Sequence, residues 1–180
     1  MNSSTSENMN LSRLPFILLS LISVFIIQET LLNRINFLIG GFSLYLVFVI
    51  AWVLQEDPSN AMLIGFFAGF IADLSPTLES PFGLWTLLLT GFCYFLATTV
   101  RGNLDPQISP LQMSLVTTAG AVTSLILFVF IGAILGQELA SIRVLTSEVV
   151  GNALWSLILA PIYIPITIKM YRLTLTAREK

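Results

Sequence analysis

Apolar residues along the chain gather into six long runs separated by short polar breaks. The runs cover residues 14–30, 37–54, 61–74, 82–100, 111–135 and 146–168. They lack the alternation of apolar and polar residues that a membrane barrel would need. Continuous apolar runs of about 20 residues instead predict helices that cross a membrane. The third run would be only about 21 Å long as a helix, which is short for a bilayer.

Proline positions agree with these boundaries. Five prolines lie in or beside the breaks: Pro58, Pro76, Pro81, Pro106 and Pro110. A missing backbone donor costs least there. Pro161 and Pro165 instead fall inside the sixth run. They predict a kink in that helix, or a break near Ala160.

The composition favours a membrane protein over a soluble bundle. Of the 180 residues, 56% are hydrophobic and 10% are charged, whereas a soluble domain has about 25% charged residues. Because so little polar surface can face water, the helices must face lipid. We therefore predict an all-α fold, a polytopic membrane bundle of about six transmembrane helices. Residues 1–12 are expected to be a disordered cytoplasmic tail, 13–170 the six-span domain and 171–180 a basic cytoplasmic tail.

The basic residues predict the orientation of the bundle. If the amino terminus is cytoplasmic, only Arg34 and Arg143 lie outside. The other six lie inside: Arg13, Arg101, Lys169, Arg172, Arg178 and Lys180. This excess follows the positive-inside rule, so both termini are predicted to be cytoplasmic. The basic carboxy-terminal segment is expected to lie against anionic lipid headgroups.

Small residues follow one face of the third run. Ala61, Gly65, Gly69 and Asp73 recur at a spacing of four, and Gly65 to Gly69 forms a GxxxG motif. Such a face lets another helix backbone approach closely. We expect Gly65, Gly69 and Asp73 to organise the bundle or to dock a partner helix. A carboxylate in the centre of a lipid-facing helix costs about 3 kcal/mol, so Asp73 needs a partner or a proton if it is deep, and otherwise caps the following turn.

Polar residues also recur at helical spacing in the last three runs. The three sets are Thr86, Thr90, Tyr94 and Ala97; Thr117, Gly120, Ala121 and Ser124; and Glu148, Asn152 and Trp155 or Ser156. We expect one polar seam inside the bundle, although tight packing also explains the threonines and serines. Glu148 and Asn152 are the stronger candidates for a site, because a charge and an amide one turn apart are costly to bury. Trp155 lies near a span end, where tryptophans anchor helices at the interface.

Two breaks between runs hold further candidates. The loop at residues 75–84, which leads into the fourth run, contains two prolines and Gly83. Because rigid turns position the helix that follows, Pro81 and Gly83 are candidate docking residues. In an earlier break, the adjacent Glu56 and Asp57 are predicted to form a solvated turn rather than a metal site.

Patterns of catalytic or metal-binding residues are missing from the sequence. The chain has no histidine and a single cysteine, which excludes histidine triads and cysteine–histidine metal sites. It has no Walker loop and no GxSxG motif. A net charge of −2 without a basic patch in a folded segment argues against nucleic acid. We predict that the protein is not an enzyme and has no catalytic residue, metal or cofactor.

Several motifs in order resemble one family. They are GFFAGFIADLS at residues 65–75, PFGL at 81–84, GFCYFLA at 91–97 and VGNALW at 150–155. Together they resemble the rod shape-determining protein MreD family, which has a glycine-rich helix ending in Asp-Leu, a short loop, and a last span with asparagine near tryptophan. The resemblance runs over most of the chain, and these motifs cover about a third of it.

The resemblance implies a fold, a role and partners. The fold would be a six-helix bundle similar to the substrate-binding subunits of energy-coupling-factor transporters. The role would be in the elongation complex that makes the bacterial cell wall, in the cytoplasmic membrane. The partners would be the single-span protein MreC, the MreB filament system, the RodA glycosyltransferase and a penicillin-binding transpeptidase.

Three hypotheses follow. The first is a non-catalytic scaffold that docks other membrane helices and recruits wall synthases, because small-residue faces occur without catalytic groups. The alternative is a small-molecule-binding subunit of a transporter, with Glu148 and Asn152 in its pocket. The third, a membrane enzyme acting on lipids, is disfavoured by the missing nucleophile and metal patterns.

Overall fold

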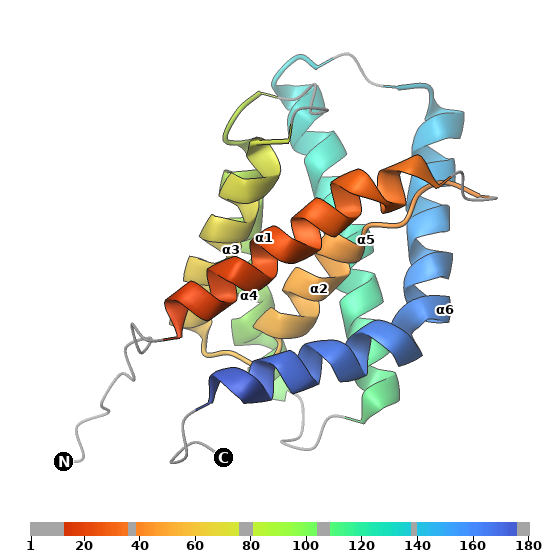
Figure 1. Ribbon diagram of the computed structural model, residues 1–180. Helices are drawn as coiled ribbons and strands as arrows, with labels where there is room; N and C mark the ends of the chain where they lie inside the picture. The colour runs from red at the N-terminus through yellow and green to blue at the C-terminus, as the bar shows by residue number, and fades with distance from the viewer. Residues whose placement is uncertain (1–12, 36–38, 76–80, 104–108, 138–139, 176–180) are drawn as a thin grey trace.

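The computed structural model describes residues 13–35, 39–75, 81–103, 109–137 and 140–175. The helices in these ranges are α1 (Leu14–Thr30), η1 (Leu32–Arg34), α2 (Leu44–Val53), α3 (Pro58–Asp73), α4 (Leu84–Asn103), α5 (Pro110–Ile134) and α6 (Ile142–Thr174). All are α-helices except η1, a single 3-10 turn. The described ranges contain no strand, so the predicted all-α class is confirmed (Figure 1).

Local sequence signals explain where several helices begin. α3 and α5 have Pro58 and Pro110 in the first turn, where the missing N–H and the fixed φ of proline favour a helix start. Ser109 and Gln112 form a reciprocal capping box at α5. The Gln112 N–H donates to the Ser109 hydroxyl at 3.2 Å, and the Ser109 N–H donates to the Gln112 side chain at 3.1 Å. These contacts satisfy backbone donors that a helix start otherwise leaves unpaired.

Helix α2 is the centre of the bundle. Each of its residues from Tyr45 to Val53 is buried, as expected for a helix that is apolar on all sides. The helix has 10 residues, or about 15 Å, so a helix over the whole of the apolar run 37–54 was the wrong prediction. Gly40, at φ +54°, and Gly41 precede it, and glycine at positive φ interrupts a helix.

Three helical segments are long and apolar enough to cross a membrane by length and composition: Leu14–Arg34, Pro110–Ile134 and Ile142–Thr174. Helices Leu44–Val53 and Leu84–Val100 are apolar but shorter. The outward faces carry many large apolar side chains, among them Leu19 and Phe130, which are 65% and 62% exposed. This arrangement is compatible with a bundle whose exterior faces lipid.

Helix α6 bends sharply in its second half. It is continuous over 33 residues with Pro161 and Pro165 inside, and Figure 1 shows its last turns running in a different direction from its first. Of the two predicted outcomes, a kink and a break, the structure has the kink. Each proline removes one intrahelical hydrogen bond and its ring pushes the preceding turn away. The bent half reaches Thr174, four residues into the segment assigned to the carboxy-terminal tail.

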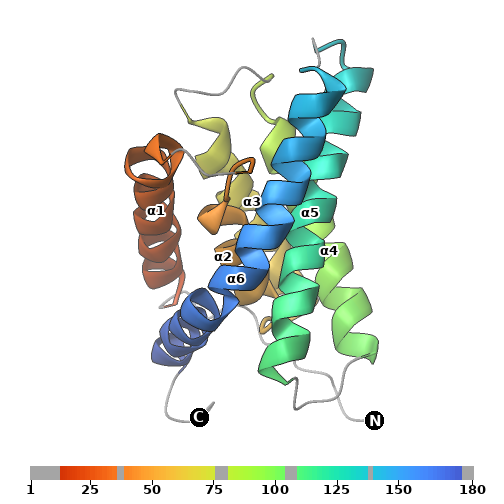
Figure 2. The ribbon, with the colours of Figure 1, turned by 90° about the vertical axis from the view of Figure 1, so that its right-hand side faces the viewer.

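Successive helices run in alternating directions. The start of α1, the connection from α2 to α3 and the end of α6 therefore meet at one end of the bundle (Figures 1 and 2). Two contacts establish this directly, because the Arg13 side chain donates both to Glu56 at 2.8 Å and to Thr174 at 3.2 Å. The end of α1 meets the end of α3 at the opposite end, where the Ser75 hydroxyl donates to Glu29 at 3.0 Å.

The alternation can be tested with two exposed serines, one at each end. Ser59 lies in the first turn of α3 and Ser141 precedes α6. In a Cys93→Ser background, a membrane-impermeant maleimide should label Ser141→Cys in intact cells and Ser59→Cys only after permeabilisation. Labelling of both positions from the same side would contradict the alternation.

Candidate functional site

The glycines of α3 form a close contact with the backbone of α4. A side chain at Gly65 would collide with the Leu89 carbonyl oxygen and lie 2.9 Å from the Cys93 Cβ. At Gly69 it would collide with the backbone of Trp85 and Thr86. Both glycines therefore press α3 directly against the backbone of α4. Removing a side chain is what permits this approach, as at other small-residue helix contacts.

Asp73 ends the same face and binds the start of α4. Its carboxylate accepts from the Trp85 N–H at 3.0 Å, the Thr86 N–H at 2.9 Å and the Thr86 hydroxyl at 2.6 Å. The side chain is 6% exposed. A carboxylate at a helix amino terminus satisfies donors without an intrahelical partner and meets the positive end of the helix dipole. Asp73 therefore caps α4 across the gap between the helices.

Together, Gly65, Gly69 and Asp73 form what we call the glycine seam. All three are buried within the chain. The outward side of α3 instead carries large apolar residues: Met62, Leu63, Phe66, Phe70 and Leu74. The glycine seam is thus occupied by the chain's own α4.

Residues of α6 hold the segment that leads into α2. The Gly41 N–H donates to the Glu148 carboxylate at 2.9 Å, and the Trp155 indole donates to the Ile39 carbonyl at 3.3 Å. A side chain at Gly151 would collide with Ile39 and lie 2.7 Å from the Gly40 Cα. The irregular segment before α2 is therefore fixed by polar contacts to α6.

Glu148 and Asn152 make separate hydrogen bonds. Glu148 is exposed and faces Gly41, whereas Asn152 is buried and accepts from the Ser156 hydroxyl at 3.2 Å. The single polar seam predicted across three helices is also wrong. Tyr94 is 47% exposed, while Thr117 is fully buried. The polar positions belong to separate contacts because their helices meet different neighbours.

Pro81 and Gly83 lie at the entrance to α4. Pro81 is exposed, and Gly83 has φ +96° with open space around its missing side chain. A left-handed residue here turns the chain so that the first N–H groups of α4 point to Asp73. The rest of this predicted docking loop, residues 76–80, lies outside the described residues.

The sequence interpretation missed a buried polar cluster at the other end of the bundle. It comprises Arg13, Trp52, Glu56, Tyr171 and Thr174, and we call it the end cluster. The prediction of a solvated turn at Glu56 was wrong, since Glu56 is 3% exposed and Arg13 is 8% exposed. The sequence signal was an arginine directly before the first apolar run and an acidic residue two positions after the end of the second.

Contacts in the end cluster connect the start of α1, the end of α2 with the connection after it, and the end of α6. Glu56 accepts from Arg13 at 2.8 Å and from the Trp52 indole at 3.3 Å. The Arg13 guanidinium lies 5.5 Å from the centre of the Tyr171 ring, within range of a cation–π contact. Burial raises the pKa of Glu56, and the Arg13 guanidinium offsets part of that effect. The raised pKa means that the cost of removing this carboxylate from water exceeds the attraction of its partner.

None of these sites brings together the groups that a metal ion requires. Within the described ranges, no three His, Cys, Asp or Glu side chains cluster. Three carboxylates make internal contacts instead: Asp73 to α4, Glu148 to Gly41, and Glu56 to Arg13. These three carboxylates thus bind the protein's own backbone and side chains, whereas the buried Thr117 hydroxyl has no hydrogen-bond partner among the described residues.

Comparison with known families agrees with the motifs on the glycine seam. The model of the family described as rod shape-determining protein MreD matches residues 10–174, which include all six helices. The chain belongs to the MreD family. No curated protein and no solved structure matches it. The glycine seam and the end cluster are accordingly features of an MreD protein, whose functional class is rod shape determination.

Alanine substitutions can test the glycine seam against a glycine that makes no contact. Gly65→Ala and Gly69→Ala should each lower the free energy of unfolding by about 1–3 kcal/mol, because the new methyl groups meet backbone atoms. Gly91→Ala on α4 should be neutral or stabilising by up to about 1 kcal/mol, since nothing lies within 4 Å of its Cβ. Unfolding of each variant in detergent with increasing dodecyl sulfate would measure these changes in free energy. Equal stability of all three variants would contradict a close contact of Gly65 and Gly69 with the backbone of α4.

The end cluster predicts a different pattern. Glu56→Ala should lower the free energy of unfolding by about 3 kcal/mol, because it leaves the Arg13 charge buried without its partner. The double variant Arg13→Met, Glu56→Leu should be closer to the original protein, since both charges leave together. The same unfolding assay applies. A double variant less stable than Glu56→Ala would contradict the interpretation of the pair.

Proposed function

We propose that this MreD protein is a non-catalytic scaffold of the bacterial elongation complex in the cytoplasmic membrane. It would bind the single-span protein MreC and, through it or beside it, RodA-like and transpeptidase enzymes and the MreB filament system. One observation carries the proposal. The buried Asp73 carboxylate has all its described hydrogen bonds with α4, which supports a structural role for it.

The outward faces of the helices suit contact with other membrane helices. On α3, the exposed rings of Phe66 and Phe70 are stacked 6.4 Å apart, and Phe70 meets Phe82 edge to face at 6.0 Å. On α6, Ile158 and Ile162 are each 60% exposed. In lipid there is little hydrophobic drive between helices, so a partner would be held by the fit of such rigid, shaped surfaces.

The arrangement of the ends supports the proposed orientation. The end that holds Arg13, Lys169 and Arg172 carries most of the basic residues described, whereas Arg34 and Arg143 lie at the opposite end. The positive-inside rule then favours cytoplasmic termini. A partner's large outer domain would sit beyond the other end.

Site-directed crosslinking tests the scaffold. In a Cys93→Ser background, single cysteines are placed outward at Phe66, Phe70, Ile158 and Ile162, and inward at Ala68 and Ala160, which are buried. With co-expressed MreC carrying a cysteine in its span, we expect disulfide crosslinks from at least one outward pair and none from the inward positions. Cells that depend on the chain should lose their rod shape when it is depleted.

Two outcomes would contradict the scaffold. One is normal rod shape without the chain, together with no crosslink from either face. The other is a turnover of lipid-linked wall precursors by the purified protein. A small molecule retained through purification, detected by native mass spectrometry and lost in Asn152→Ala, would favour the transporter-like alternative instead.

A further inference from the structure

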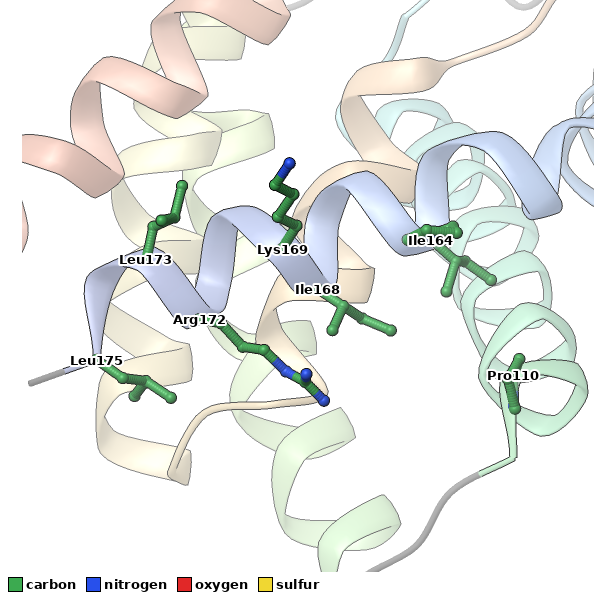
Figure 3. Close-up of a pocket in the computed structure, with 8 residues that line it drawn as sticks. Pro110, Ile164, Ile168, Lys169, Arg172, Leu173 and Leu175 are labelled. Atoms are coloured by element: carbon green, nitrogen blue, oxygen red, sulfur yellow. The ribbon is translucent and has the colours of Figure 1, made fainter. Parts of the chain in front are cut away.

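A hollow of about 990 Å³ lies beside the bent half of α6. Its lining includes Pro110 at the start of α5 and Ile164, Pro165, Ile168, Lys169 and Arg172 on α6. Figure 3 shows Ile168 and Arg172 projecting from the same side of α6, while Lys169 leaves its opposite edge. The hollow exists because the prolines turn α6 away from α5. It is separate from the glycine seam and from the end cluster.

The lining combines two kinds of surface. Its walls are mainly proline and aliphatic side chains, and its charged groups are Lys169 and Arg172, both exposed. The ion pair found among the described residues is that of Arg13 with Glu56, so neither cation is paired with a carboxylate in that part of the chain. An apolar wall next to two such cations matches a ligand with an anionic head and a hydrocarbon chain.

The bent half of α6 is held firmly, so the hollow does not depend on a movement. Tyr171 donates from its hydroxyl to the Gln55 carbonyl at 2.8 Å and packs edge to face on Trp52 at 5.9 Å. Thr174 accepts from Arg13 at 3.2 Å. The inner side of this helix half is thus fixed to Arg13 before α1, to α2 and to the connection from α2 to α3, while its opposite side carries the hollow.

The location also suits a lipid. The hollow lies where α6 leaves its apolar stretch and gains basic residues, at the end of the bundle that gathers most of the described basic side chains. Exposed Ile162 and Ile166 continue the apolar surface along the helix. Hydrocarbon chains can therefore enter the hollow from the side while a headgroup remains near water.

We propose that the hollow binds one anionic phospholipid. The Arg172 guanidinium holds the headgroup phosphate, since its planar fork matches two phosphate oxygens. Lys169 at the other edge adds positive potential, and an acyl chain lies on Ile164 and Ile168. A zwitterionic lipid lacks the net charge, and a free phosphate leaves the apolar wall bare. The proposal does not depend on the scaffold function.

Native mass spectrometry of the full chain in a mild detergent tests the site. Phosphatidylglycerol is titrated against phosphatidylcholine as the zwitterionic control. The original protein should retain one phosphatidylglycerol in preference to phosphatidylcholine. Because each basic residue near an anionic headgroup contributes to binding, Lys169→Gln, Arg172→Gln should weaken retention by about 30-fold.

Matched variants separate a site from a general charge effect. Arg34→Gln, Arg143→Gln removes the same charge from exposed residues at the other end and should leave retention unchanged. Ile168→Trp should reduce retention by filling the hollow without changing any charge. The proposal is overturned if the two double variants retain phosphatidylglycerol equally, or if Ile168→Trp retains as much as the original protein. It is also overturned if glycerol phosphate displaces the lipid. Retention of no lipid would overturn it as well, since another part of the chain would then fill the hollow.

Discussion

The contact between α3 and α4 is the constraint on which the bundle depends. Two helix backbones can approach this closely only where side chains are missing, and Gly65 and Gly69 remove them at successive turns. Asp73 then fixes the register, because its carboxylate reaches the first N–H groups of α4 only when the glycines are aligned with Trp85 and Thr86. In lipid, apolar surface gives little drive for helices to associate. Close packing and hydrogen bonds between α3 and α4 therefore hold the two helices together there, a role that burial of apolar surface has in water.

The other helices are arranged around the short central α2. Because α2 is enclosed on all sides, its 10 residues need neither a polar face nor the length of a span. The irregular segment before it needs hydrogen-bond partners instead, and α6 supplies them through Glu148 and Trp155. This segment is only partly covered, since Ile39 is exposed and Gly40 and Gly41 are half-buried, so these hydrogen bonds rather than burial hold it in place.

Much of the architecture was predictable from the apolar runs and the prolines of the sequence. Six helices, their order and the kink at Pro161 and Pro165 follow from the lengths of the runs and the positions of prolines. The length of α2 was not predictable, because Gly40 and Gly41 stop the helix through contacts with a segment more than 100 residues later.

Of the two candidate sites, the glycine seam was partly predictable from the sequence and the end cluster was not. The spacing of Gly65, Gly69 and Asp73 identified a close-packing face, but it could not say whether the partner was another protein or the chain's own α4. The end cluster was beyond sequence reasoning, since Arg13 and Glu56 are 43 residues apart and each is, by itself, an ordinary charge beside an apolar run. Pairing of distant charges is a property of the folded arrangement and leaves little local pattern.

The hydrogen bond from Arg13 to Thr174 spans 161 residues, nearly the whole chain. During synthesis the first helix therefore enters the membrane long before its last partner has been made. Until α6 arrives, the guanidinium has only Glu56 and water to stabilise it, and any shortened product keeps that incomplete environment. Closure of the end cluster therefore has to wait for α6, and a chain without that helix leaves the Arg13 guanidinium without the Thr174 hydroxyl and the Tyr171 ring.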